Sequence, residues 1–187
     1  MCLVIFVFAQ APLQVGYAIL TADPGSNVPV GAALFSSTNT EGVLVWEAGV
    51  AAVEPISTGR IFVDQQGGSL TALALVNPSA QTVIVTLILR DTAGVEVDRQ
   101  DLSLEGGHHE AVFVNQIFSG LESFTGSMSF QTPTSNEKVA AVTLRQSTNL
   151  DQEAIFSTLP VVDLTAPVTT DSLIFPQVGA GVGLSTQ

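Results

Sequence analysis

The tripeptide Ser-Thr-Asn occurs twice in this chain, at residues 37–39 and 147–149, in closely similar surroundings. Each copy follows a leucine at the same distance and precedes an apolar residue and an aromatic one, Trp46 in the first case and Phe156 in the second. When the sequence is shifted by 110 positions, about fifty residues align without a gap, with seven identities. A period of this length is too long for one unit of a solenoid and typical of a whole sandwich domain. The sequence therefore predicts two copies of one folded unit, against the alternative of chance similarity between two β-rich stretches.

The repeat predicts three parts of the chain. Residues 1–56 correspond to the C-terminal part of one β-sandwich repeat, residues 59–164 to a complete repeat, and residues 165–187 to a linker and the first strand of a further repeat. On this interpretation the chain is truncated mid-domain at both ends. A second interpretation of the N-terminus is a short signal-peptide core that ends in Ala9-Gln10-Ala11, although no basic residue precedes Arg60.

Composition limits the partners that such a chain can have. The net charge is −12, and only five residues are Lys or Arg. Nucleic acid and anionic membrane surfaces require clustered basic residues, so neither is a predicted partner. The apolar run near the N-terminus is shorter than the ~20 residues that a transmembrane helix needs, so no membrane insertion is predicted. The single cysteine, Cys2, excludes an internal disulfide.

Alternating apolar residues predict strands in the complete repeat. In "TVIVTLILRD" one face carries Val83, Val85, Leu87 and Leu89, as expected for a sandwich strand. The next segment, "VEVDRQDLSL", also alternates, which predicts that its valines point inward. Between the two strands, "DTAG" predicts a hairpin turn with Gly94 at positive φ.

Further strands follow at regular spacing. "SLTALALVNPSA" predicts a strand that ends in a turn at Asn77-Pro78-Ser79, and "HEAVFVNQIF" predicts a strand that runs into one helical turn. No segment shows a sustained period of 3.6 residues with caps, so helix should be scarce. The pattern predicts an all-β fold, an antiparallel immunoglobulin-like β-sandwich, with a closed barrel as the alternative.

Two sequence features could suggest a ligand or metal site. In "VGAGVGL" the glycines Gly179, Gly181 and Gly183 resemble part of a dinucleotide fingerprint, but Leu184 occupies the last required glycine position and no room for a helix follows. His108 and His109 are adjacent, and neighbours on a strand point to opposite faces, so they cannot share one metal ion. His108 and Glu110 could share a face, but two ligands do not make a site.

The remaining candidates are a cation site and an aromatic platform. Calcium at an inter-domain junction near Asp163 or Glu54 stays open as an alternative, although the Asp-x-Asp-x-Asp-Gly pattern is absent. Trp46 and Phe156 occupy equivalent places in the repeat and are predicted to be core residues, whereas an exposed Trp46 would suggest a sugar-stacking platform. No nucleophile motif such as Gly-x-Ser-x-Gly occurs. The sequence predicts no catalytic, cofactor-binding or metal-binding residue and no cofactor.

The chain resembles the tandem immunoglobulin-like β-sandwich repeats of bacterial secreted and cell-surface proteins. The resemblance is carried by "ALALVNPSAQTVIVTLILRDTAGVEV", "LSLEGGHHEAVFVNQIF", "FTGSMSFQT" and "VAAVTLRQSTN". It implies an extracellular or cell-surface, non-catalytic structural or adhesive module whose partners are neighbouring repeats and a surface protein or glycan. The alternative is a carbohydrate-binding accessory module of a secreted hydrolase, which an aromatic row on one sheet face would favour.

Overall fold

The computed structural model describes residues 16–28, 30–168 and 172. Strands account for most of the regular structure in this part of the chain, as the sequence predicts. In order, the elements are β1 (Ala32–Thr38), β2 (Leu44–Ala51), β3 (Thr58–Asp64), β4 (Leu70–Val76), β5 (Val83–Asp91), β6 (Glu96–Leu104), β7 (His109–Phe113), α1 (Val114–Ile117), β8 (Thr125–Gln131), β9 (Ala140–Thr148), β10 (Ala154–Leu159) and β11 (Val162–Asp163).

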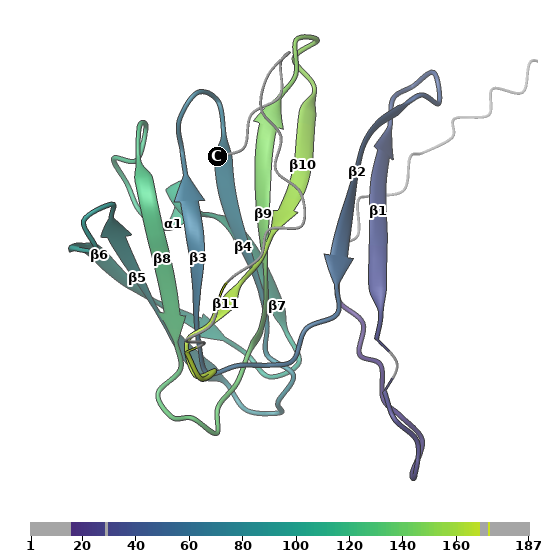
Figure 1. The fold of residues 1–187 in the computed structure, drawn as a ribbon, viewed down its shortest axis with the longest axis vertical. Coiled ribbons are helices and arrows are strands. Elements are labelled where there is room, and N and C mark those ends of the chain that lie inside the picture. The colour runs from purple at the N-terminus through teal and green to yellow at the C-terminus, as the bar shows by residue number, and fades with distance from the viewer. Residues whose placement is uncertain (1–15, 29, 169–171, 173–187) are drawn as a thin grey trace, which may run out of the picture.

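Strands β3 to β11 form two antiparallel sheets that face each other as a β-sandwich (Figure 1). One sheet has the order β10-β9-β4-β7 and the other β11-β3-β8-β5-β6. The described strand orders have ends, so the fold is not the closed barrel that the sequence left open as an alternative. The core between the sheets is apolar and draws on both layers, and its largest fully buried side chains include Phe118, Phe130, Ile61, Leu73, Leu87 and Met128.

Strand β5 shows how the sequence pattern fixes a sandwich strand. Val83, Val85, Leu87 and Leu89 are almost completely buried, which confirms the predicted apolar face. From Thr86 onward β5 lies between β6 and β8, so this part of the strand has hydrogen-bonding neighbours on both sides. Alternation in a strand with two neighbours therefore predicted the buried face correctly.

The alternation in β6 was interpreted wrongly. Val95 and Val97 are 59% and 50% exposed, although the sequence predicted that they point inward. The pairing of β5 and β6 shifts between Leu89 and Arg90, so that Leu89 lies opposite Asp98 while Arg90 lies opposite Glu96. Before this shift, Leu102 and Leu104 lie opposite the buried Val85 and Val83 and face the core. Val97 is an odd number of residues from both leucines, so ordinary alternation points it outward.

Two turns have the predicted residues in the predicted conformations. Gly94 has a φ of 81°, which suits the hairpin between β5 and β6. Asn77 is fully buried and every polar atom of its amide has a partner. Its Nδ2 donates to the carbonyl oxygens of Gln81 at 2.7 Å and Leu104 at 2.9 Å, and its Oδ1 accepts from both donors of Ser79. The Asn-Pro-Ser turn is therefore pinned to the end of β6 by one side chain.

Helix is scarce among the described residues, which confirms the prediction. The single helical segment of the described chain, α1, has four residues and follows directly after β7, where the sequence predicted one helical turn. No helix in the described part of the chain is long and apolar enough to cross a membrane. The helical turn also buries Val114 and leads into the buried Phe118, so it closes one end of the core.

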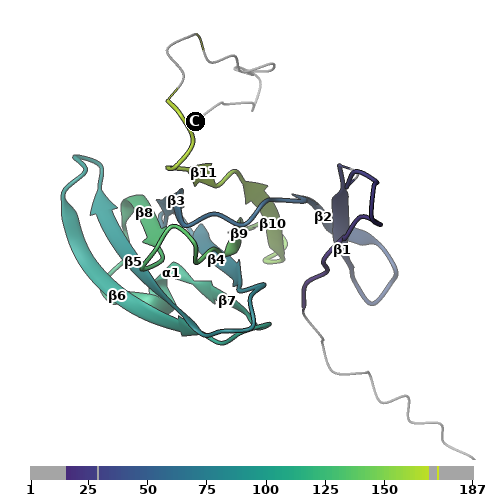
Figure 2. The same ribbon diagram turned by 90° about the horizontal axis from the view of Figure 1, so that it is seen from below.

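Strands β1 and β2 form a separate two-stranded antiparallel hairpin beside the sandwich (Figure 2). Residues 16–31, other than the undescribed 29, contain no strand. The sequence predicted that residues 1–56 form the C-terminal part of a sandwich repeat. An offset of 110 aligns residues 16–21 with most of β8, and these residues form no strand.

Candidate functional site

A polar cluster lies at one end of the sandwich, where the two sheets meet. Arg145 of β9 projects from the inward face and its Nη2 donates to Asp64 Oδ2 at 2.9 Å and to Ser69 Oγ at 2.7 Å. Thr71 Oγ1 accepts from the Asp64 backbone N–H at 2.9 Å. Asp64 belongs to the five-stranded sheet and Arg145 to the four-stranded sheet, so this ion pair connects the two layers.

A pocket of about 360 Å³ lies beside this cluster. Its volume falls at the lower end of the range for small-molecule sites. The β3–β4 turn and the segment after α1 supply the walls, which combine polar and apolar groups: Gln65, Gly68, Ser69, Leu70, Asn115, Phe118, Gly120, Leu121 and Glu122. The turn is held to the other wall by a hydrogen bond from Gln65 N to the carbonyl oxygen of Phe124 at 2.8 Å.

Gln65 is the unusual residue of this pocket. It is 5% exposed, and neither its Nε2 nor its Oε1 has a hydrogen-bond partner in the protein. Leaving a buried amide unpaired costs about 1–3 kcal/mol. Both atoms are shielded from solvent, so a molecule held in the open pocket would not reach the amide without movement of the walls.

Replacing Gln65 with leucine should therefore raise the free energy of unfolding by about 1–2 kcal/mol, because the unpaired amide is removed while the buried volume is kept. Chemical denaturation of the full chain measures this. The neighbouring Gln66→Leu is the matched control. Gln66 is exposed and its Nε2 donates to Thr125 Oγ1, so its replacement should give no gain. A loss of stability in Gln65→Leu would show that the amide has a partner, such as an ordered water molecule.

Among the residues that the structure describes, the side chains at this end of the sandwich form no nucleophile–base pair. The hydroxyl of Ser69 is engaged by the Arg145 guanidinium, which cannot act as a base. The residues that the structure describes hold no group of three or more His, Cys, Asp or Glu side chains able to bind a metal ion.

The structure places the predicted histidines at the start of β7. His108 lies in the turn before it, with Nδ1 at 3.2 Å from the carbonyl oxygen of Gly106. His109 is the first residue of β7, and its ring lies 6.5 Å from the ring of Tyr17. Glu110 follows on the same strand, and the structure brings no third metal ligand to these residues within its described part.

The junction predicted as a calcium alternative carries separate carboxylates. Asp163 ends β11 and its Oδ1 accepts from the backbone N–H and the hydroxyl of Thr165, both at 2.7 Å. These hydrogen bonds hold the pKa of Asp163 below its ordinary value. Glu54 is exposed. Cys2 and the glycines of "VGAGVGL" lie outside the described residues.

Trp46 and Phe156 are not core residues, contrary to the prediction. Both are half-buried and pack against each other where the hairpin meets β10, with ring centroids 5.0 Å apart. Phe35 lies edge-on to Trp46 at 5.1 Å. Thr158 Oγ1 adds a hydrogen bond of 2.7 Å to the carbonyl oxygen of Gly49. The indole of Trp46 thus contacts rings on two sides and is a poor platform for a sugar.

The sequence interpretation missed Gln65, Asp64 and Arg145. A signal was present for Arg145, because it continues the inward series Ala141 and Thr143 on β9. A charge in an inward series predicts a buried partner of opposite sign. Nothing in the sequence marks Gln65, because its burial depends on the packing of α1 and the following segment.

Comparison with known proteins places the chain in no family. No protein-family model matches it, and no curated protein does. The chain is similar to a solved structure described as "Crystal Structure of Thermotoga maritima 1070", with 8% sequence identity and a TM-score of 0.44, over 57% of this chain and 94% of that chain. A similarity of this size carries no conclusion about fold or function.

Proposed function

We propose that the chain is a non-catalytic structural or adhesive module, built from repeated immunoglobulin-like sandwich units, of an exported bacterial multi-domain protein. Its role is that of a spacer: folded units in series hold a binding or catalytic part at a distance from the cell. Its partners are neighbouring units of the same polypeptide and a surface protein or glycan. The observation that carries the proposal is that hairpins β1–β2 and β9–β10, 110 residues apart, share one turn and pack together.

The two turns have the same hydrogen bonds at equivalent positions. Asn39 Oδ1 accepts from the backbone N–H groups of Glu41 and Val43, both at 3.0 Å. Asn149 Oδ1 accepts from Asp151 at 3.0 Å and from Glu153 at 2.8 Å. The last position of each turn, Gly42 or Gln152, has a positive φ. The repeated asparagine therefore accepts equivalent backbone hydrogen bonds and stabilises the turn in both hairpins.

The turn alone does not establish a repeat. Asp91 makes the same pattern in the β5–β6 hairpin, where its Oδ1 accepts from Ala93 and Val95, both at 2.9 Å. This turn is a general solution for a short hairpin. Support for two copies of one unit comes from the turn together with the constant offset, the shared Ser-Thr-Asn and the aromatic residue that follows each turn.

The two hairpins differ in register after the turn. In β1–β2 the pairing shifts between Ser37 and Thr38, so that Ser37 lies opposite Trp46. In β9–β10 there is no shift, and Ser147 lies opposite Ile155. A bulge moves the following side chains to the other face of a strand. Two related hairpins can thereby present Trp46 and Phe156 to each other.

A modular scaffold predicts that the hairpin and the sandwich unfold separately. Trp46 is the single tryptophan of the chain and reports on the hairpin junction. During titration with urea, Trp46 fluorescence should change at a lower concentration than far-UV circular dichroism, which is dominated by the sandwich. Phe156→Ala should lower the fluorescence midpoint further. A single coincident transition in both signals would contradict modular units.

The alternative function, a carbohydrate-binding accessory module, can be tested with the same signal. Exposed aromatic rings do not form a row on either sheet face of the described sandwich, where Phe62 is the exposed example on β3. Titration of the full chain with soluble oligosaccharides should leave the fluorescence of Trp46 unchanged. A saturable change would favour carbohydrate binding over a scaffold.

A further inference from the structure

The outer edge of β1 has no neighbouring strand in the described chain and carries no charged residue. Within the described chain β1 pairs only with β2, and Figures 1 and 2 show it on the side of the hairpin away from β10. All seven residues of β1, Ala32–Thr38, are uncharged. Leu34 is 70% exposed and Leu44 on the neighbouring strand is 55% exposed. Such an edge offers unpaired backbone donors and acceptors to another strand.

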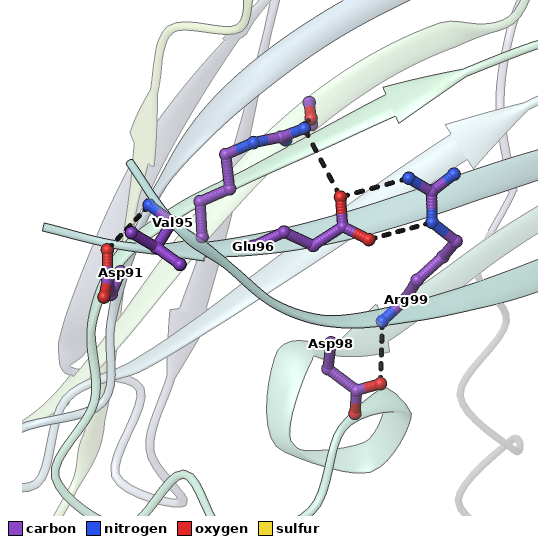
Figure 3. A network of polar contacts seen from close by, with 7 residues as sticks. Asp91, Val95, Glu96, Asp98 and Arg99 are labelled. Atoms are coloured by element: carbon purple, nitrogen blue, oxygen red, sulfur yellow. Dashed lines mark hydrogen bonds and ion pairs between the residues drawn. The ribbon is translucent and has the colours of Figure 1, made fainter. Parts of the chain in front are cut away.

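The other described strand edges are charged, short or covered. Strand β6 carries Glu96, Asp98, Arg99 and Asp101 along the edge of its sheet. Figure 3 shows the carboxylate of Glu96 held by Arg99, through two hydrogen bonds of 3.0 Å. Strand β11 has two residues, and β7 has five, with a histidine and a glutamate at its start. Charged and short strands are the usual protection against edge pairing, and β1 has neither.

The edge of β10 is protected in another way. The hairpin itself lies beside β10, with Trp46 against Phe156 and a hydrogen bond from Thr158 to Gly49. The counterpart of β1 in the sandwich, β9, is paired on both sides, by β10 and by the uncharged strand β4. If β1 resembles β9, it can pair with a strand on each side, but in the described chain it pairs with one strand only.

We propose that β1 pairs in antiparallel fashion with β1 of a second copy of this chain, giving a four-stranded sheet across two molecules. A second copy is the occupant that the chemistry favours, because an uncharged strand paired with itself brings no like charges together. Around a two-fold axis the segment with Leu34 and Phe35 meets itself, so apolar groups lie opposite apolar groups. The comparison of β1 with β9 rests on the proposed repeat, whereas the argument from the uncharged edge of β1 does not.

Charge outside the contact predicts a salt dependence. Each copy has a net charge of −12, and the hairpin strands contribute only Glu47 to it. Two copies therefore repel each other at long range while the contact itself is neutral. Screening by salt weakens this repulsion, so dimerisation should strengthen as the salt concentration rises.

Sedimentation equilibrium of the full chain between about 5 and 500 μM tests the proposal, since this range detects micromolar dissociation constants. The wild type should show a reversible monomer–dimer equilibrium that tightens from low to high salt. Leu34→Lys should raise the dissociation constant at least tenfold, because two like charges meet near the axis. The exposed position of Leu34 means that the substitution should leave far-UV circular dichroism unchanged.

Val97→Lys is the matched control. Val97 is also an exposed apolar residue on an edge strand, and its replacement changes the net charge equally. This variant should dimerise like the wild type. A monomeric wild type over the whole concentration range would overturn the proposal. So would a dimer that Val97→Lys dissociates as strongly as Leu34→Lys, because the contact would then not lie on β1.

Discussion

Replacing Gly126 with alanine should lower the free energy of unfolding by about 3 kcal/mol, the upper end of the usual cost of overpacking. A Cβ at this position would lie inside contact distance of the Arg90 carbonyl oxygen and 2.8 Å from Cζ of Phe124. Gly126 pairs with Asp91, so the obstructing carbonyl belongs to the paired backbone of β5 and cannot turn aside. Denaturation with urea, followed by circular dichroism, measures the loss.

Gly49→Ala is the control for the general effect of removing a strand glycine. A Cβ at Gly49 would meet Cδ2 of Leu34 at 3.7 Å, an ordinary contact distance, so the substitution should change stability by less than about 0.5 kcal/mol. If Gly126→Ala lowered the free energy of unfolding as little as Gly49→Ala, the backbones of β5 and β8 would not approach each other as closely as described.

Phe130→Ala should have the largest effect, a loss of about 4 kcal/mol. Phe130 on β8 is fully buried in the centre of the core. Its removal gives up both the transfer of the ring from water and its packing contacts, and leaves a cavity that paired strands cannot close. Phe62→Ala is the matched control, because Phe62 on the adjacent strand β3 is 50% exposed and its loss should cost about 1 kcal/mol or less.

Phe130 also explains why residue 59 is a glycine. A Cβ at Gly59 would lie 2.6 Å from Cε1 of Phe130 and 3.0 Å from Cδ1 of Ile56. Gly59→Ala should therefore be destabilising in the wild type and much less so in the Phe130→Ala background. Additive effects of the two substitutions would show that the ring does not pack over Gly59.

The sequence predicted the sandwich best where local and tertiary requirements agree. The buried face of β5, the turn at Asp91 and the helical turn after β7 follow from residue pattern and turn chemistry, and all three are present. The inward face of β6 was predicted wrongly because the valines and the leucines of this segment alternate on opposite faces, and the pairing with β5 places Leu102 and Leu104 on the core side. The prediction that Trp46 lies in the core was wrong because aromatic character indicates burial but does not indicate which surfaces meet.

The candidate pocket was beyond local sequence reasoning. Asp64 and Arg145 are 81 residues apart and become partners only because β3 and β9 lie in opposite layers. The unpaired amide of Gln65 arises from burial by the segment after α1, which no periodicity reveals. Patterns along a strand fix a face, whereas pairing across layers depends on topology.

If β1–β2 and β9–β10 are copies of one structural unit, as we propose, one hairpin should be able to replace the other. In the full chain, residues 144–159 would be replaced by residues 34–49, with Arg145 retained to keep its ion pair with Asp64. We expect this chimera to unfold in a cooperative transition with the wild-type dependence on urea and a lower midpoint. A chimera without a cooperative transition would show that the two hairpins are not equivalent.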